Sequence, residues 1–276
     1  MGEIIACANQ KGGVGKTTTV VNLASFLAQA GRRVLIVDLD PQGNATSGTG
    51  LGTREVDRSI YPVLVGSGNL QDLIAAAGIE GLSIIPSSRD LAGAEVELVP
   101  LAGRERRLAR ALLPVKNDFD YILMDCPPSL GLLTVNALTA ADSVLIPIQC
   151  EYYALEGLGQ LLSTIELVRA HLNPELSIKG VVMTMFDGRT TLSADVSAEV
   201  RRHMGDQVFQ TQIPRSVRLA EAPSYGRPIS EYSPASRGAL AYAALASEML
   251  ARDNGGVPAA LTAVEAAGTP AWATRA

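Results

Sequence analysis

The stretch that decides the fold is Gln10-Lys11-Gly12-Gly13-Val14-Gly15-Lys16-Thr17-Thr18, a glycine-rich loop near the start of the chain. It follows the apolar run Ile4–Ala8, which predicts a strand, and it opens a helix-length segment, Lys16–Ala30. In this setting glycines let backbone N–H groups turn inward and cradle phosphates at the N-terminus of a helix. The pattern therefore predicts a nucleotide-binding P-loop, in which Lys16 reaches the β- and γ-phosphates and the Thr17 hydroxyl binds Mg²⁺.

Strand-like and helix-like segments alternate along the rest of the chain. The further strand-like runs are Arg33–Asp38, Leu82–Pro86, Tyr121–Asp125, Ser143–Ile148, Lys179–Met185 and Gln207–Ile213. The further helical segments are Glu105–Leu113, Leu130–Ala140, Glu151–His171, Leu192–His203 and Ala235–Ala251. Most strand-like runs are apolar at consecutive positions, which is typical of parallel strands covered on both faces. The alternation predicts an α/β fold with a doubly wound, mainly parallel sheet flanked by helices on both faces.

The composition fits one domain of this kind. The chain has 276 residues, 47% of them hydrophobic, which is enough for a full core without disulfides. We predict a single P-loop ATPase domain over residues 1–252 and a flexible tail over residues 253–276, which is rich in Ala, Thr and Pro. The net charge of −5 argues against a surface that coats nucleic acid everywhere, but it leaves room for a local basic patch.

The loop departs from the usual P-loop pattern at one position. The pattern G-x-x-x-x-G-K-[ST] has glycine where this chain has Gln10, and an additional lysine, Lys11, follows it. The string Lys11–Thr18 resembles the deviant Walker A box of the ParA/MinD branch of P-loop ATPases. In that branch the extra lysine reaches across a dimer interface to the partner's nucleotide, so the resemblance implies this role for Lys11.

Two aspartates stand at the end of the second strand-like run, in Val37-Asp38-Leu39-Asp40-Pro41-Gln42-Gly43. Residues two apart on a strand point to the same side. We therefore expect Asp38 and Asp40 together at the carboxyl edge of the sheet, where ligands bind in open α/β folds. In ParA-like proteins the second of these carboxylates orients the water that attacks the γ-phosphate, which implies this role for Asp40. Asp38 is expected to support Mg²⁺ or the loop geometry.

A third aspartate, Asp125, ends the apolar run Tyr121–Asp125. An apolar strand that ends in Asp has the Walker B form, so we predict that Asp125 holds Mg²⁺ through bound water. The segment that follows, Cys126-Pro127-Pro128, looks like a switch that senses the γ-phosphate.

Further strings extend the resemblance to the ParA/Soj chromosome-partitioning ATPases from residue 4 to about residue 250. They are Asp38–Asn44, Asp125–Leu130, Thr184–Asp187 and Ile213–Ser224, the last of which is specific to the Soj-like subgroup. The resemblance implies ATP and Mg²⁺ as cofactors, with the nucleotide bound by Lys11, Gly12, Gly13, Val14, Gly15, Lys16, Thr17 and Thr18. It also implies base contacts from Met185 and Pro214, and catalytic roles for Lys11, Lys16 and Asp40.

The same resemblance implies a function in DNA segregation. Family members form an ATP-dependent sandwich homodimer, bind double-stranded DNA without sequence preference, and are reset when a ParB-type protein stimulates hydrolysis. The positions of Arg189 and Arg218 match family positions implicated in DNA binding. Between residues 201 and 237 the chain has six arginines against three acidic residues, a local excess that suits phosphate contacts. We expect a cytoplasmic, nucleoid-associated ATPase that is weak alone.

Two other functions are compatible with the same P-loop ATPase domain. A MinD-like membrane-cycling ATPase would need an amphipathic C-terminal helix, and after residue 253 the only basic residue is Arg275, so no membrane partner is expected. A P-loop enzyme that activates a small molecule would need an acceptor pocket near the γ-phosphate, and the sequence shows no polar constellation that marks one.

Overall fold

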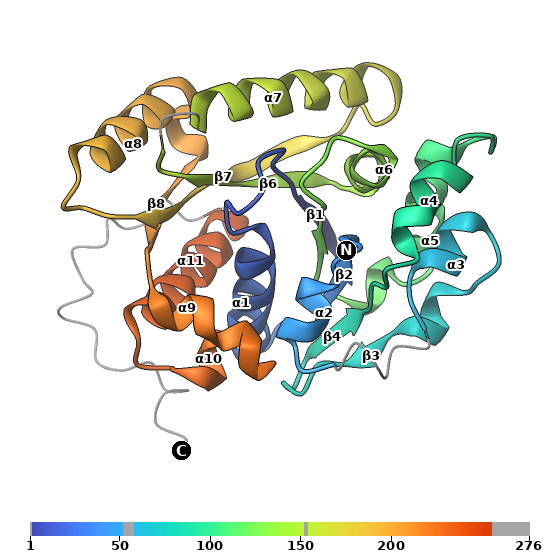
Figure 1. Ribbon diagram of the computed structural model, residues 1–276, viewed down its shortest axis with the longest axis horizontal. Helices are drawn as coiled ribbons and strands as arrows, with labels where there is room; N and C mark the ends of the chain where they lie inside the picture. Colours follow the sequence, from blue (N-terminus) through green and yellow to red (C-terminus); the bar gives the residue numbers. More distant parts are fainter. Residues whose placement is uncertain (1, 52–57, 152–153, 256–276) are drawn as a thin grey trace.

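The computed structural model of the chain describes residues 2–51, 58–151 and 154–255 (Figure 1). The predicted ATPase domain, residues 1–252, lies almost wholly within these segments. The predicted tail, residues 253–276, lies outside the described residues from position 256 onward.

The described residues form one eight-stranded sheet with the strand order β3-β4-β2-β5-β1-β6-β7-β8. The strands are β1 (Glu3–Cys7), β2 (Val34–Asp38), β3 (Ala75–Ala76), β4 (Leu82–Ile85), β5 (Tyr121–Asp125), β6 (Ser143–Gln149), β7 (Ser177–Phe186) and β8 (Val208–Pro214). Neighbouring strands are parallel throughout this described sheet except for the antiparallel pair β3 and β4. The predicted mainly parallel sheet is confirmed, and β3 is an addition to it.

Helices cover both faces of this sheet (Figure 1). One face packs against α1 (Lys16–Gln29), α11 (Arg237–Asp253) and the short α9 (Val217–Glu221) and α10 (Ile229–Tyr232). The other packs against α3 (Tyr61–Val65), α4 (Leu91–Glu97), α5 (Arg107–Leu112), α6 (Leu132–Ala140), α7 (Ala154–His171) and α8 (Thr191–Met204). The short α2 (Asn44–Gly48) follows β2. Among the described residues, no helix combines the length and apolar character needed to cross a membrane.

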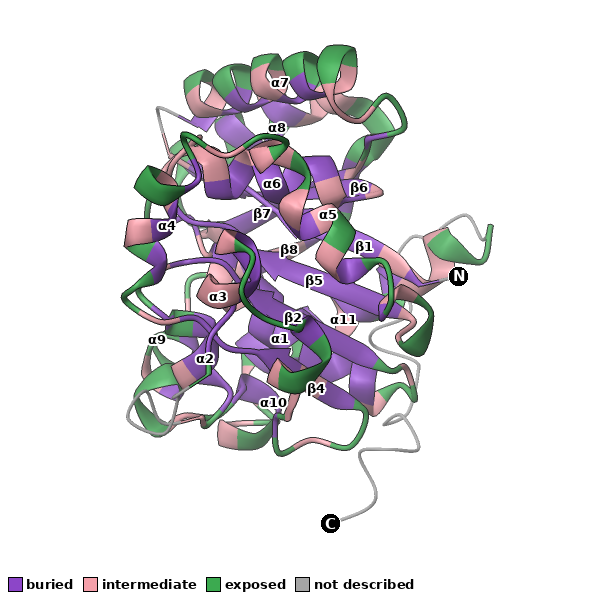
Figure 2. Ribbon diagram, turned by 90° about the vertical axis from the view of Figure 1, so that its right-hand side faces the viewer, coloured by how far each residue is buried: buried purple, intermediate pink, exposed green. Residues whose placement is uncertain are grey.

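Each strand sends alternate residues into the two helical layers. In β1, Ile4 and Ala6 belong to the core that includes α4 to α8, whereas Ile5 and Cys7 belong to the core that includes α1 and α11. Figure 2 shows the central strands buried along their length. Burial on both faces explains why the strand-like runs are apolar at consecutive positions rather than at alternate ones.

The last strand, β8, pairs irregularly with β7. Val208 pairs with Val181 and Gln212 pairs with Met183, so β8 contains extra residues between these two pairs. Such a bulge takes backbone groups out of the ladder. Glu248 of α11 compensates for this, because its carboxylate accepts the backbone N–H groups of Gln210 at 2.8 Å and Thr211 at 2.9 Å.

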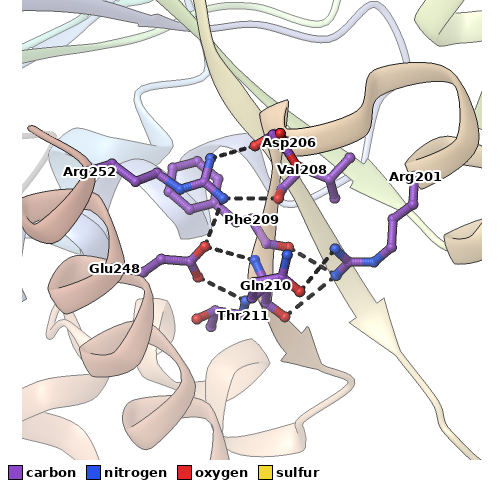
Figure 3. Close-up of polar contacts among 8 residues, drawn as sticks. All are labelled: Arg201, Asp206, Val208, Phe209, Gln210, Thr211, Glu248 and Arg252. Atoms are coloured by element: carbon purple, nitrogen blue, oxygen red, sulfur yellow. Dashed lines mark hydrogen bonds and ion pairs between the residues drawn. The ribbon is translucent and has the colours of Figure 1, made fainter. Parts of the chain in front are cut away.

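Arginines from both helical layers complete this edge of the sheet (Figure 3). Arg252 donates to the Glu248 carboxylate at 2.8 Å and to the Val208 carbonyl at 2.9 Å, and its guanidinium lies over the Phe209 ring. From the other layer, Arg201 donates to the Phe209 carbonyl at 3.0 Å. We call Arg201, Glu248 and Arg252 the β8 clamp. It satisfies backbone groups that would otherwise be free to pair with another strand, so Arg201 serves the fold rather than a basic surface.

Candidate nucleotide-binding site

Three neighbouring strands bring the predicted site residues together at the carboxyl edge of the sheet. The last residues of β1 and β2, Cys7 and Asp38, both pair with Asp125 at the end of β5. The glycine-rich loop leaves β1 directly after this row and leads into α1 (Figure 1). The structure therefore places the loop and the aspartates of β2 and β5 side by side, as the sequence predicts.

The loop has the backbone geometry of a phosphate cradle. Gly13 and Gly15 have φ angles of +74° and +87°, a conformation that side chains other than glycine rarely adopt. The N-terminus of α1 has no side-chain cap and no acidic residue in its first turn among the described residues. Its N–H groups and the helix dipole thus favour an anion. The side chain of Lys16 is largely buried beside the loop, where its Nζ donates to the Lys11 carbonyl at 3.2 Å.

Lys11 is held from two sides by residues that the sequence reasoning missed. The backbone N–H of Lys11 donates to Asn9 Oδ1 at 3.0 Å, and Asn9 in turn donates to the Pro147 carbonyl at 2.7 Å. The Lys11 ammonium pairs with Glu151 Oε2 at 3.0 Å. Asn9 follows β1 and Glu151 follows β6, so a polar residue just past a buried strand was the available signal for both.

Asp125 is fully buried, and neither of its carboxylate oxygens has a hydrogen-bonding partner among the described residues. Burial and the neighbouring Asp38 raise the pKa of Asp125 well above its usual range, and the Thr17 hydroxyl and Lys16, which lie nearby without a hydrogen bond to either oxygen, lower it only in part. A buried carboxylate without partners is costly in a fold. Oxygen ligands and a negative charge beside a phosphate cradle are what Mg²⁺ prefers, so Asp125 and Thr17 fit this ion.

The two aspartates of the second strand differ in their surroundings. Asp38 Oδ2 accepts the backbone N–H of Thr46 at 2.8 Å and its hydroxyl at 2.7 Å, and Oδ1 accepts the Asp40 N–H at 3.1 Å. Burial still raises the pKa of Asp38 to about 6. Of the two roles predicted for Asp38, these bonds favour loop geometry over metal support. Asp40 Oδ1 accepts the Gln42 N–H at 2.9 Å, which fixes the carboxylate beside the row of strand ends.

Met185 and Pro214, the predicted base contacts, lie at the carboxyl ends of the neighbouring strands β7 and β8. The pairing of Phe186 with Pro214 brings these ends together. Among the described residues, Met185 is the only one other than glycine with a positive φ, +50°. Such a conformation persists only where the surroundings impose it, and it is common at binding sites.

The predicted DNA contacts, Arg189 and Arg218, lie outside the core. The side chain of Arg189 is 89% exposed and forms a two-point contact with Asp187, through Nε at 2.9 Å and a terminal nitrogen at 2.8 Å. This contact holds the pKa of Asp187 well below its usual range. Arg218 is 59% exposed and pairs with Glu221 at 2.9 Å. Both guanidinium groups are accessible to a ligand from solvent.

Comparison with known proteins adds to this geometry. The family described as "AAA domain" matches residues 2–178. The sporulation initiation inhibitor protein Soj of Bacillus subtilis is 59% identical over 251 residues, which cover 91% of this chain and 99% of that protein. The chromosome partitioning protein ParA of Myxococcus xanthus is 53% identical over 254 residues, 92% of this chain and 90% of that protein.

A solved structure is also similar over most of the chain. It is described as cobyrinic acid a,c-diamide synthase from Mycobacterium smegmatis with bound ADP and magnesium. It is 41% identical, with a TM-score of 0.81, and the match covers 92% of this chain and 96% of that chain. The same protein has also been solved with an ATP analogue and magnesium. A P-loop protein of this fold thus binds the ligands that the site geometry fits.

Proposed function

This chain belongs to the ParA/Soj family of chromosome-partitioning ATPases, and from this premise we propose that it is an ATP-dependent, dimerising switch that binds DNA without sequence preference. ATP brings two copies together, and the dimer binds double-stranded DNA. Hydrolysis, stimulated by a ParB-type partner, releases the DNA and resets the cycle. In this proposal the protein acts in the cytoplasm, on the nucleoid.

The observation that carries the proposal is the proximity of Asp125, at the end of β5, to Lys16 and Thr17 in the first turn of α1, whose N-terminus has no side-chain cap. When bound, Mg²⁺ neutralises charge on the phosphates during phosphoryl transfer. In our proposal Thr17 and Asp125 hold the ion, and the bonds from Thr46 keep Asp38 as a brace for the loop that carries Asp40. Lys16 exchanges the Lys11 carbonyl for the β- and γ-phosphates, and Asp40 orients the attacking water.

The proposed dimerisation gives Lys11 its role. In one copy of the chain its ammonium pairs with Glu151 and is partly exposed. To act on the nucleotide of a second copy, Lys11 leaves Glu151 and crosses the interface, where it stabilises the charge that develops on the phosphates, as an arginine finger does. The proposal makes each active site incomplete without the partner.

DNA binding follows from accessible cations that only the dimer presents in duplicate. A single exposed arginine binds a phosphate weakly, but two linked patches bind with an effective concentration that raises the overall affinity. Arg189 and Arg218 are the proposed contacts, and their acidic partners, Asp187 and Glu221, are neighbours in sequence that need not move far to release them.

The test is co-sedimentation with DNA in the presence of ATP, ADP or no nucleotide. We expect binding only with ATP, prolonged in Asp40→Ala because hydrolysis fails, and lost as salt rises. Arg218→Ala is expected to weaken binding about tenfold. Arg33→Ala is the matched control. Arg33 is also 59% exposed and ion-paired, but it directly precedes β2 and so lies at the amino ends of the parallel strands, away from the nucleotide site. Equal binding with ATP and ADP would overturn the switch.

The similarity to the Mycobacterium smegmatis protein favours one further candidate, a P-loop enzyme that activates a small carboxylic acid. This candidate predicts ATP turnover that depends on the acid and is indifferent to DNA. Absence of DNA binding in every nucleotide state, together with acid-dependent turnover, would favour it. Co-sedimentation with liposomes in the presence of ATP tests the MinD-like alternative in the same series.

A further inference from the structure

The side chain of Thr184 joins β7 to the phosphate loop. Its hydroxyl donates to the Val14 carbonyl at 2.8 Å. Both residues are 2% exposed, so water does not compete for this hydrogen bond. The two residues lie far apart in sequence, and their contact connects the loop to the carboxyl end of β7, the neighbour of the edge strand β8, rather than to the helix that follows the loop.

The peptide between Val14 and Gly15 carries this contact into the site. In a trans peptide the carbonyl and the following N–H point in opposite directions, and no described peptide is cis. Because the Val14 carbonyl points toward β7, the N–H of Gly15 points away from it. We propose that Thr184 is a positioning residue for the phosphate loop, which holds the Val14 carbonyl and thereby aims the Gly15 N–H at the phosphates.

The space beside Gly15 is also limited by Thr184. An added Cβ at Gly15 would lie 3.8 Å from Thr184 Cβ and Cγ2, which is ordinary van der Waals distance. Gly15 adopts φ +87° at the start of α1, a conformation that favours glycine. The hydrogen bond to the Val14 carbonyl is therefore the contact through which Thr184 acts on the loop.

Thr184 is itself held rigidly. It pairs with Gln149 of β6, and its carbonyl accepts the Cys150 N–H at 3.3 Å. It precedes Met185, which has a positive φ within the last residues of β7. A fixed donor on a strand is better suited to orient a glycine loop than a donor on another loop, because glycine alone leaves many backbone conformations open.

The inference rests on the nucleotide site of the proposed function, and it is tested by nucleotide affinity alone. Thr184→Val removes the hydroxyl at nearly constant shape, and Thr184→Ser keeps it. We expect the Kd for Mg·ATP and for Mg·ADP to rise about tenfold in the Val variant and to stay within about twofold in the Ser variant. ATP and ADP suffer equally because the loop N–H groups cradle phosphates that both nucleotides contain.

Thr19→Val is the matched control, because Thr19 is fully buried on α1 but its hydroxyl pairs with Tyr242 in the core, 3.1 Å away. It is expected to lower the melting temperature without changing either Kd. A Thr184→Val protein that melts lower yet binds both nucleotides like wild type would overturn the inference, as would equal losses in the Val and Ser variants. If the wild-type chain itself binds neither nucleotide, the proposed function fails with it.

Discussion

Two buried carboxylates in this molecule have opposite surroundings. Glu248 is 5% exposed and accepts hydrogen bonds from the backbone of Gln210 and Thr211 and from Arg252 (Figure 3). Asp125 is 0% exposed, and within the described part of the chain its two oxygens accept no hydrogen bond. Both residues carry a carboxylate and both are buried. They differ in whether the protein supplies hydrogen-bond donors to that carboxylate.

The contrast separates a structural charge from a functional one. A buried carboxylate that the protein satisfies completely stabilises the arrangement around it, whereas one that it leaves unsatisfied lowers the stability of the metal-free fold. Asp125 lies near Lys16 and the uncapped N-terminus of α1, whereas Glu248 lies on α11 and binds the edge strand β8. A cation at the first site would supply what the protein there does not.

The largest expected effect is at Asp125, where one substitution should lower activity and raise stability. Asp125→Asn removes the proposed ligand of Mg²⁺, so we expect ATP turnover to fall about 10³-fold, which corresponds to about 4 kcal/mol. The magnesium-dependent part of the ATP affinity, measured with and without EDTA, is expected to vanish. The free energy of unfolding of the metal-free protein should rise at the same time, because a carboxyl group whose ionised form is disfavoured by burial and by Asp38 is replaced by a neutral amide. A variant that is both inactive and less stable would contradict the contrast.

Glu248→Ala tests the other half of the comparison. Removing Glu248 leaves the Arg252 guanidinium and two backbone N–H groups without this hydrogen-bond acceptor. We therefore expect the free energy of unfolding to fall by about 3 kcal/mol. Denaturant titration measures this loss, while the Kd for ATP of the folded protein stays near that of wild type. Glu166→Ala is the control, because Glu166 also pairs with an arginine, Arg169, but is 69% exposed. Its loss is expected to be about 0.5 kcal/mol.

The pH dependence of stability gives a third test, through Asp38. Its pKa of about 6 in the folded protein lies above the usual 3.8, so between these values the folded chain binds more protons than the unfolded chain. The free energy of unfolding therefore falls as pH rises through this window, by roughly 2 kcal/mol. The measurement is the difference between wild type and Asp38→Asn at pH 4 to 7, without nucleotide. A difference that does not change with pH would show that burial does not perturb this carboxyl.

The carboxyl edge of the sheet was predictable because each contributor has a local signature. The glycine-rich loop, the aspartates after β2 and the aspartate at the end of β5 all follow apolar strands directly. Parallel strands bring such positions to one edge whatever the order of the strands. The prediction that Asp125 binds a metal could therefore be made from the fold class alone, without knowledge of any side-chain contact.

The β8 clamp and the contacts of Lys11 were not predictable in this way. Glu248 accepts hydrogen bonds from a backbone segment 38 positions away, and the N–H groups of that segment are free to donate only because β8 bulges against β7. Glu151 and Lys11 are 140 positions apart, and no sequence pattern around either residue predicts that they pair. The short helices α2, α3 and α9 contain five residues each, too few to show a helical period.

The smallest expected effect concerns Glu151, a carboxylate of a third kind. It is neither buried nor left alone, since its side chain is 43% exposed and pairs with Lys11. An ion pair that must open during a cycle has to be weak, and exposed pairs contribute about 0 to 1 kcal/mol. Glu151→Gln is therefore expected to tighten the ATP-dependent dimer by about two- to fivefold, measured by sedimentation velocity, and Glu166→Gln is expected to leave it unchanged. A weaker dimer in Glu151→Gln would contradict this prediction. It would mean that Glu151 stabilises the dimer through contacts of its own more than it weakens the dimer by pairing with Lys11. Glu151 would then be a contributor to the proposed dimer interface rather than a group that only holds Lys11 back.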